Sequence, residues 1–234
     1  GSAGCVLATR LTDNPKVKVL LIEAGGDPTL EVMTPGLALY TRRSQFDWNY
    51  TSIDDGYAYQ CYKNKGFEMT RGHGLGGTSG VNFMVYARGN PFDYNQWAAI
   101  VNDSSYTWDN LLPYFNRGEH LEDETTLNSK YAHLYGTKGE VGINKFPDPA
   151  KEKYLKALDE VGFKTVLDVN GNETLGFNFP MFTVANGTRQ SSCFCHLSPV
   201  RDRANLHVLK NTKVTKILFN GTRAYVFKNI LSSS

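Results

Sequence analysis

The chain opens with two glycines and a later acidic residue whose spacing suits the binding of a dinucleotide. Gly1 and Gly4 stand in the segment GSAG, before a stretch with helical apolar spacing, and Glu23 follows an aliphatic run. In a dinucleotide fold such glycines admit a pyrophosphate and close helix–strand packing, and an acid about 20 residues later binds ribose hydroxyls. We expect phosphates at this helix start and a ribose at Glu23. The alternative is a tight turn before an ordinary helix, with Glu23 as a solvated surface acid.

A second glycine-rich segment, RGHGLGGTSGVNFMVYARGN, covers residues 71–90. It has too many glycines for a core strand. It also lacks the lysine and following Ser/Thr of a P-loop, which argues against hydrolysis of a nucleoside triphosphate. Composition leaves two interpretations open, a flexible loop or backbone laid along a flat cofactor. A loop made only for flexibility would not need Asn82, Phe83 and Met84 directly after the glycines.

The elements that must position these segments begin with a helix and a buried strand. Residues 2–12 predict the helix, residues 17–22 a strand of the type that parallel sheets use, and residues 27–80 a loop-rich region. Further helices are expected after an N-cap at Asn90 and running through Trp97, after Thr107 with Pro113 ending or kinking the helix, and over 149–161 before Gly162.

The last third of the chain is rich in strand signals. Strands are expected within 177–184, at 206–209, over 214–219 and, after an Asn220-Gly221 turn, at 224–227. A helix and buried strand followed by a β-rich region predict an α/β nucleotide-binding core with a second, antiparallel subdomain.

Composition excludes several classes of protein. The 234 residues are 41% hydrophobic and 21% charged with a net charge of +2, which is too balanced for a nucleic-acid footprint. No apolar run approaches the roughly 20 residues of a membrane span. Four cysteines are too few for a disulfide scaffold. Cys5 is expected in the core, and a Cys61–Cys193 link stays possible. Cys193, Cys195 and His196 lack a second pair at zinc spacing, which favours packing over metal binding.

Glycosylation sequons give a clue to compartment. They occur at five asparagines, where chance would supply about 2–3: Asn49, Asn102, Asn172, Asn186 and Asn220. This excess favours a secreted or extracellular protein.

The 71–90 segment resembles a known family signature. Its pattern RG-x-x-LGG-[ST]-S-x-x-N-x-M-x-Y-x-RGN is similar to the first signature of the glucose–methanol–choline (GMC) oxidoreductases, which bind FAD. The resemblance continues in DYNQWA, YTWDNLLPYF and YGTKGEV and resumes in GTRQSS…LSPVRDRANLHVLKNTKVT, in family order across nearly the whole chain. Within the family, the sequence of these motifs most resembles the arthropod branch that includes glucose dehydrogenases and ecdysone oxidases.

The resemblance implies a set of FAD-binding residues. Gly1, Ser2 and Ala3 would meet the pyrophosphate and Glu23 the adenosine ribose. The flavin side would be lined by Arg71, Gly76, Gly77 and Thr78, with Asn82, Phe83, Met84 and Val85 at the isoalloxazine, largely through backbone. Val214 would contact the adenine through its main chain, although by itself it predicts only a core strand residue.

The FAD is expected to be non-covalent. Some members attach it through a histidine just before the asparagine, and here that position is Val81. His73 lies in the same loop but elsewhere, and is expected to be a surface or packing residue. A nicotinamide-dependent dehydrogenase is the alternative on the same βαβ unit, against which the 71–90 signature argues.

The resemblance also implies an architecture and a reaction. We expect an incomplete Rossmann-like FAD-binding domain over 1–92, an antiparallel α+β substrate subdomain over 93–200, and a return to the first domain over 201–234. Family members oxidise an alcohol by hydride transfer to the flavin while a histidine takes the hydroxyl proton. That histidine and its His or Asn partner belong to a later segment, so we assign no catalytic residue. The substrate would be a small alcohol, either a sugar or a steroid.

The same comparison predicts that parts of the domain are missing. The first strand and the first motif glycine are expected before residue 1, and the closing strands after residue 234. Open strand edges would then make FAD binding weak. A non-catalytic truncated product is the alternative to an active enzyme.

Overall fold

The computed structural model describes residues 1–171, 173 and 175–231. The chain divides into two compact units, unit 1 (Gly1–Phe83 with Gly187–Ser234) and unit 2 (Met84–Asn186). The functional boundaries expected at residues 92 and 200 stay a prediction.

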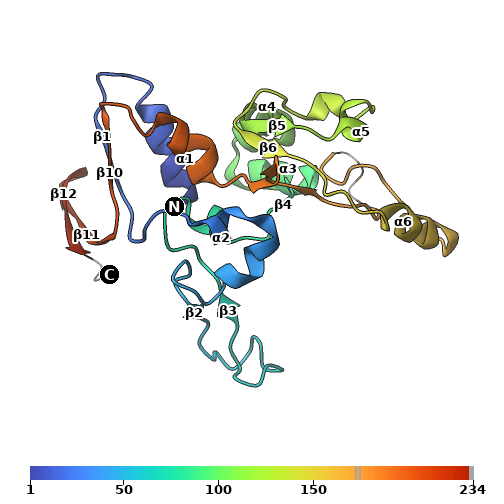
Figure 1. Cartoon of the computed structure of the whole chain (residues 1–234), viewed down its shortest axis with the longest axis horizontal. Coiled ribbons are helices and arrows are strands. Elements are labelled where there is room, and N and C mark those ends of the chain that lie inside the picture. The colour runs from blue at the N-terminus through green and yellow to red at the C-terminus, as the bar shows by residue number, and fades with distance from the viewer. Residues whose placement is uncertain (172, 174, 232–234) are drawn as a thin grey trace. The chain divides into compact units, whose positions relative to one another are not determined.

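Unit 1 is built around one helix and a pair of parallel strands. Helix α1 (Ser2–Leu11) leads to β1 (Val19–Ile22), which pairs in parallel with β10 (Leu206–Leu209). Figure 1 shows the two strands side by side, with α1 next to them. The predicted first helix and the 206–209 strand are confirmed. The strand expected at 17–22 forms at 19–22, but the expectation that it is buried is wrong: Leu20 is 50% exposed, because among the described residues β1 has a strand on one side only. Parallel pairing brings together segments almost the whole chain apart, which is typical of α/β folds.

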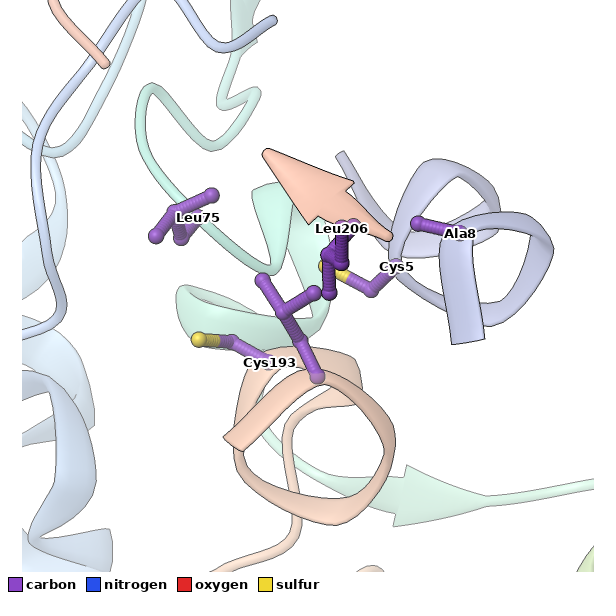
Figure 2. Close-up of a cluster of buried hydrophobic side chains, with 6 residues drawn as sticks. Cys5, Ala8, Leu75, Cys193 and Leu206 are labelled. Carbon is purple, nitrogen blue, oxygen red and sulfur yellow. The ribbon is translucent and has the colours of Figure 1, made fainter. Parts of the chain in front are cut away.

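The core of unit 1 lies where α1 meets these strands. Figure 2 shows Cys5 and Ala8 on α1 gathered with Leu75, Cys193 and Leu206. Cys5 is fully buried, as expected. None of the described cysteines forms a disulfide, and Cys61 is exposed whereas Cys193 is buried, so the possible Cys61–Cys193 link is wrong. This apolar cluster fixes the start of α1 relative to the carboxyl ends of the strands.

The rest of unit 1 consists of short elements and one long hairpin. The elements are α2 (Leu30–Met33), a 3₁₀ turn (Pro35–Thr41), β2 (Tyr50–Thr51) antiparallel to β3 (Glu68–Met69), the 3₁₀ turn η2 (Gly77–Gly80), β9 (Thr188–Arg189), the π-helical turn η5 (Cys193–Leu197), and β11 (Thr212–Asn220) antiparallel to β12 (Arg223–Leu231). The hairpin turns at Gly221-Thr222, with Asn220 paired to Arg223, so the turn forms one residue later than predicted.

Unit 2 mixes helices with short strands. It contains β4 (Val85–Tyr86), α3 (Pro91–Val101), α4 (Trp108–Gly118), β5 (Glu119–Leu121), α5 (Glu124–Leu127), β6 (Val141–Ile143), α6 (Lys151–Glu160), β7 (Met181–Phe182) and β8 (Val184–Ala185). β4 pairs antiparallel with β7, whereas β5 and β6 are parallel. The predicted cap is confirmed, because Asn90 Oδ1 accepts a hydrogen bond from Phe92 N at 2.8 Å.

Three details of unit 2 differ from the sequence-based expectation. Helix α3 runs to Val101, beyond Trp97. Pro113 lies inside α4 and does not end it, so of the two expected outcomes the helix end is wrong and the kink stays a prediction. Of the strand expected within 177–184, only short pieces near its end form, and Phe177 makes an isolated bridge with Thr165.

A buried ion pair lies at the centre of unit 2. The Arg88 guanidinium binds the Glu119 carboxylate, and the two side chains are 0% and 4% exposed. Arg88 also donates to Leu134 O at 2.7 Å, and its guanidinium lies over the Tyr135 ring, 4.2 Å from the ring centroid. Arg88 thereby links β4, β5 and the loop before β6.

Among the helices in the described part of the chain, none combines the length and the apolar character that crossing a membrane requires.

Candidate functional site

Glu23 lies at the point where the parallel strand β1 ends and faces the start of α1. Its Oε2 is 2.8 Å from the nitrogen of Gly1, and its Oε1 accepts a hydrogen bond from Gly25 N at 3.2 Å. The Glu23 main chain bonds Leu209 O and Thr212 N, so β10 and β11 fix its position. Only 8% of the residue is exposed. The interpretation of Glu23 as a solvated surface acid is therefore wrong.

The first turn of α1 offers free N–H groups with no acidic side chain beside them. Gly1 is the N-cap and provides no side-chain cap, and the first turn holds no Asp or Glu. Ala3 is exposed and Ser2 partly so. A Cβ on Gly4 would lie 3.4 Å from Leu21 Cδ1, so helix and strand pack closely there. A helix start of this kind attracts anions such as phosphates.

The second glycine-rich segment packs directly on this helix start. Ser2 Oγ donates to Gly76 O at 2.9 Å and accepts from Ser79 N at 3.2 Å. A Cβ on Gly77 would lie 2.6 Å from Gly1 Cα, and Gly77 has φ +53°. The structure therefore brings the two predicted glycine segments together, and only glycine fits at position 77.

One buried carboxylate anchors the strand that leads into this loop. Asp47 Oδ1 accepts hydrogen bonds from Arg71 N at 3.0 Å and Asn49 N at 3.1 Å, and Oδ2 accepts from Arg43 N at 3.1 Å. Burial alone would raise the pKa of Asp47, but these N–H groups stabilise the carboxylate more, so its pKa is held below the usual value. The sequence reasoning missed Asp47. In the sequence Asp47 stands between Phe46 and Trp48, and no motif or regular spacing marks it as a buried acceptor.

Arg71 and Thr78 occupy the two ends of a narrow loop. Gly72 N donates to Thr78 Oγ1 at 3.2 Å, and a Cβ on Gly72 would lie 2.1 Å from Gly77 O. The Arg71 side chain is exposed and donates to Thr70 O. Gly76 has φ +93°. The loop is thus rigid and closely folded, so the plain flexible-loop interpretation is wrong.

The four residues proposed for the isoalloxazine fall on either side of the division between the units. In unit 1, Asn82 and Phe83 are exposed, and Asn82 N donates to Thr78 O at 3.0 Å. In unit 2, Met84 is buried with φ +62° and Val85 is exposed in β4. Met84 O accepts from Thr183 N at 2.8 Å.

Val214 lies on β11, two residues after the strand has bonded Glu23. Thr212 N donates to Glu23 O at 2.9 Å, and Val214 pairs with Asn229 next to a β-bulge. Val214 is 39% exposed. This exposure does not fit the alternative interpretation as a core strand residue.

The structure adds one residue that the site prediction did not include, Arg189. Its fully buried guanidinium donates to Val32 O at 2.7 Å and to Asn82 O at 2.7 Å. Arg189 belongs to the GTRQSS motif, so the sequence marks the residue, but the motif does not indicate which groups the side chain contacts.

The histidine and cysteine candidates take other roles. His73 Nδ1 contacts Gln45 O at 3.2 Å, and its ring meets Trp48 edge-on at 4.5 Å, as expected for a packing residue. No cluster of metal-ligating side chains occurs among the residues that the structure describes. Burial raises the pKa of the Cys193 thiol to about 11, which makes it a poor nucleophile.

Unit 1 has a cavity of about 430 Å³ away from the start of α1. Its lining includes Asp27, Leu75, Cys193 and Lys210, and no residue of the predicted cofactor set. The helix start, the glycine loop and Glu23 lie together, and we call them the cradle. A second, smaller cavity is lined by Gly77 of this loop together with His73 and Val81.

The residues present fit a dinucleotide with phosphates at the start of α1. The close approach of Gly77 to Gly1, the unopposed N–H groups of the first helical turn and the carboxylate of Glu23 are the parts that such a ligand needs.

The chain matches known proteins over nearly its whole length. A GMC oxidoreductase family model matches residues 1–228. Ecdysone oxidase of Spodoptera littoralis is 40% identical over 227 residues, which cover 96% of this chain and 38% of that protein. The FAD- and quinone-dependent glucose dehydrogenase of Drosophila melanogaster is 40% identical over 94% of this chain and 35% of its own length. The chain thus spans little more than a third of these relatives.

Solved structures share the fold. Pyridoxine 4-oxidase from Mesorbium loti superposes with a TM-score of 0.86 at 27% identity, covering 98% of this chain and 44% of that one. An FAD-dependent oxidoreductase from Chaetomium thermophilum gives 0.84 at 28% identity, over 100% of this chain and 41% of that one. The α/β fold class is confirmed.

Proposed function

Because the chain belongs to the GMC oxidoreductase family, whose members are FAD flavoproteins, we propose that it supplies the FAD-binding part of an enzyme that oxidises alcohols. The reaction would move a hydride from the alcohol carbon to the flavin. The chain spans little more than a third of its relatives, so this reaction is proposed for a whole protein that contains it. The chain's own task is to hold and orient the cofactor.

One contact carries the proposal for the adenosine half of FAD. The Glu23 carboxylate faces the start of α1 at 2.8 Å from the Gly1 nitrogen, at the carboxyl end of a parallel strand. In dinucleotide folds this is where an acidic residue binds ribose hydroxyls and the helix start binds pyrophosphate. We assign the pyrophosphate to Gly1, Ser2 and Ala3, the ribose to Glu23 and the adenine to the main chain of Val214.

The flavin half is assigned to the loop that packs on this helix start. Arg71, Gly76, Gly77 and Thr78 would lie along the flavin side, with the isoalloxazine at the following segment of Asn82, Phe83, Met84 and Val85. The tight packing of Gly77 on Gly1 supports a continuous surface for the cofactor. Val81 is 4% exposed and carries no nucleophile, which supports non-covalent FAD.

The substrate proposal is a small alcohol, either a sugar or a steroid. It is supported by the names of two similar relatives, an ecdysone oxidase and a glucose dehydrogenase. The base that takes the hydroxyl proton is not assigned to any residue of this chain, so by itself the chain is proposed to bind FAD without turning over an alcohol.

Titration with FAD and ADP tests the proposal. FAD binding is followed by flavin fluorescence, and ADP by displacement and by calorimetry. We expect saturable binding of FAD that ADP displaces, and weaker binding of NAD⁺ than of FAD, because NAD⁺ shares the adenosine diphosphate but lacks the flavin assigned to the glycine loop. Glu23→Gln should weaken both FAD and ADP by about tenfold or more, because a charged hydrogen bond is worth about 1.5–3 kcal/mol. Glu31→Gln, an exposed acid in α2 of the same unit, should leave both unchanged. Binding of NAD⁺ in place of FAD would contradict the assignment.

We also propose that the protein is secreted. Four sequon asparagines are exposed in the structure (Asn49, Asn102, Asn186 and Asn220), and Asn172 lies outside the described residues. Exposed sequons are what a glycosylated extracellular protein requires. Expression in secreting insect cells should give a protein that loses mass on treatment with peptide-N-glycosidase, and Asn220→Gln should remove one glycan. An unglycosylated secreted protein would argue against this proposal.

A further inference from the structure

Arg189 is a fully buried cation whose hydrogen-bond acceptors are all uncharged oxygens. Its Nε donates to Val32 O at 2.7 Å, and its Nη1 donates to Asn82 O at 2.7 Å and to Ser79 O at 3.4 Å. The Asn82 Oδ1 atom accepts a further bond from Nη1 at 2.9 Å. The Nη2 group is buried without a hydrogen-bond partner. No carboxylate pairs with this guanidinium among the residues that the structure describes.

Packing does not explain a positive charge at position 189. Burial lowers the pKa of Arg189 to about 10, so the guanidinium stays protonated at neutral pH. A buried charge without a counter-charge destabilises a fold, and apolar side chains of similar volume often replace buried ions without loss of stability. The molecule thus keeps a positive charge that main-chain oxygens of α2, η2 and the following segment hold in place. Such a fixed charge acts on whatever lies beside it.

The Arg189 charge lies directly behind the segment to which we assign the flavin. Asn82 is exposed to solvent, while its main-chain oxygen accepts the hydrogen bond from the buried guanidinium. Asn82 N donates to Thr78 O at 3.0 Å, so the segment is fixed to the glycine loop as well. A flavin ring at Asn82 is therefore one residue away from the charge. Because Arg189 is buried, water and salt screen its field less than they screen the field of a surface charge.

We infer that the buried Arg189 charge stabilises the reduced form of FAD bound at Asn82 relative to the oxidised form. The inference rests on the proposed function, because it takes the flavin to lie at Asn82. A hydride from the alcohol carbon brings two electrons and one proton to the flavin ring, and the alcohol becomes a carbonyl compound as its hydroxyl proton leaves. The reduced ring then carries a negative charge that the oxidised ring lacks. A nearby positive charge attracts the reduced ring more strongly and so favours the hydride transfer.

The affinities of oxidised and reduced FAD test this inference. Oxidised FAD and dithionite-reduced FAD are titrated by anaerobic calorimetry, at slightly alkaline pH, into the unsubstituted chain and into Arg189→Met. The ratio of the oxidised to the reduced dissociation constant reports how binding shifts the reduction potential. For Arg189→Met we expect this ratio to fall about tenfold, which equals about 30 mV for a two-electron couple. ADP, which lacks the flavin, is titrated in parallel to report the rest of the site.

Comparing two forms of one cofactor separates the charge from the fold. A distorted or less stable site weakens both forms of FAD alike, so that loss cancels in the ratio. Arg189→Lys keeps a cation among the same oxygens but loses the planar fork of the guanidinium, so it should keep most of the ratio. Arg201→Met removes an arginine whose side chain is 75% exposed in the same unit. It should leave the ratio unchanged, because solvent screens surface charges.

The outcomes that contradict the inference differ from those that contradict the proposed function. An unchanged ratio in Arg189→Met, with FAD and ADP still bound, would overturn the inference and leave the proposed function standing. A lysine variant with the low ratio of the methionine variant would also overturn it, since the charge would then have no effect of its own. If the unsubstituted chain binds neither FAD nor ADP, the proposed function fails and the inference fails with it.

Discussion

Asp47 shows how a single buried carboxylate can make the segment before Arg71 sensitive to acid. It accepts hydrogen bonds from the main-chain N–H groups of Arg43, Asn49 and Arg71, and its pKa lies below the ordinary value of 3.8. A carboxyl whose pKa is depressed by folding stabilises the native state above the unfolded pKa, and this contribution is lost as the pH falls through the folded pKa. The strand before Arg71 should therefore loosen only below about pH 4.

Asp47→Asn tests this at the residue. The free energy of unfolding in urea should be lower than that of the unsubstituted chain at pH 7 by at least about 1 kcal/mol, because a neutral amide replaces a carboxylate that accepts three N–H groups. The difference should shrink as the pH is lowered from 4 towards 3. Asp202→Asn, at a side chain that is 93% exposed, is the control and should show no such pH dependence. A difference that is constant with pH would contradict the role given to Asp47.

Residue types and spacing singled out Glu23 and the glycines, because a ribose and a pyrophosphate need an acid and a bare backbone at fixed separations along the chain. The structure brings these residues together, and the ligand assigned to each of them stays a proposal. Asp47 and Arg189 act through contacts between segments far apart in sequence, 24 positions for Asp47 with Arg71 and 107 for Arg189 with Asn82. No local pattern encodes such contacts.

The turn η2 can pack against the start of α1 because Gly77 has no side chain. Gly77 has φ +53°, and a Cβ there would lie 2.6 Å from Gly1 Cα. Gly77→Ala should therefore separate the loop from the helix start and weaken both FAD and ADP by about tenfold or more, besides a strain of roughly 1–3 kcal/mol. Titration of both ligands measures this.

Gly221→Ala is the matched control for that prediction. Gly221 has nearly the same conformation, φ +58°, but nothing lies within 4 Å of a Cβ there. This substitution carries the strain without the clash, so stability should fall while ligand binding stays unchanged. Equal effects of the two substitutions on ligand binding would show that the approach of Gly77 to Gly1 has no part in the site.

At the level of elements, the sequence predicts where a long periodic or well-capped helix forms, but it does not predict what the helix packs against. Helix α6 (Lys151–Glu160) forms close to the predicted range with Gly162 after it, at φ +87°. Its apolar face is not buried, and Tyr154 is 64% exposed. Amphipathic spacing predicts that a helix forms, because it reflects local backbone preference and one apolar stripe. It does not say what covers the stripe.

At the scale of the whole molecule, each compact unit has its own buried cluster, so a core substitution should act mainly on its own unit. In unit 2, Glu119→Ala would leave the Arg88 guanidinium buried without its carboxylate, at a cost of about 3–5 kcal/mol. Trp97 and Trp108 report unit 2 and Trp48 reports unit 1. In a Trp48→Phe background only Trp97 and Trp108 fluoresce. Glu119→Ala should therefore strongly lower the urea midpoint that their fluorescence reports.

With Trp97 and Trp108 replaced by phenylalanine, the same Glu119→Ala substitution should move the transition that Trp48 reports much less. Glu160→Gln, an exposed residue of α6 in unit 2, should shift neither transition, because surface charges contribute little. Equal shifts at both probes would mean that the two units unfold as one cooperative body. The cofactor cradle on unit 1 would then depend on the Arg88–Glu119 pair of unit 2, and Glu119→Ala would weaken ADP binding as well.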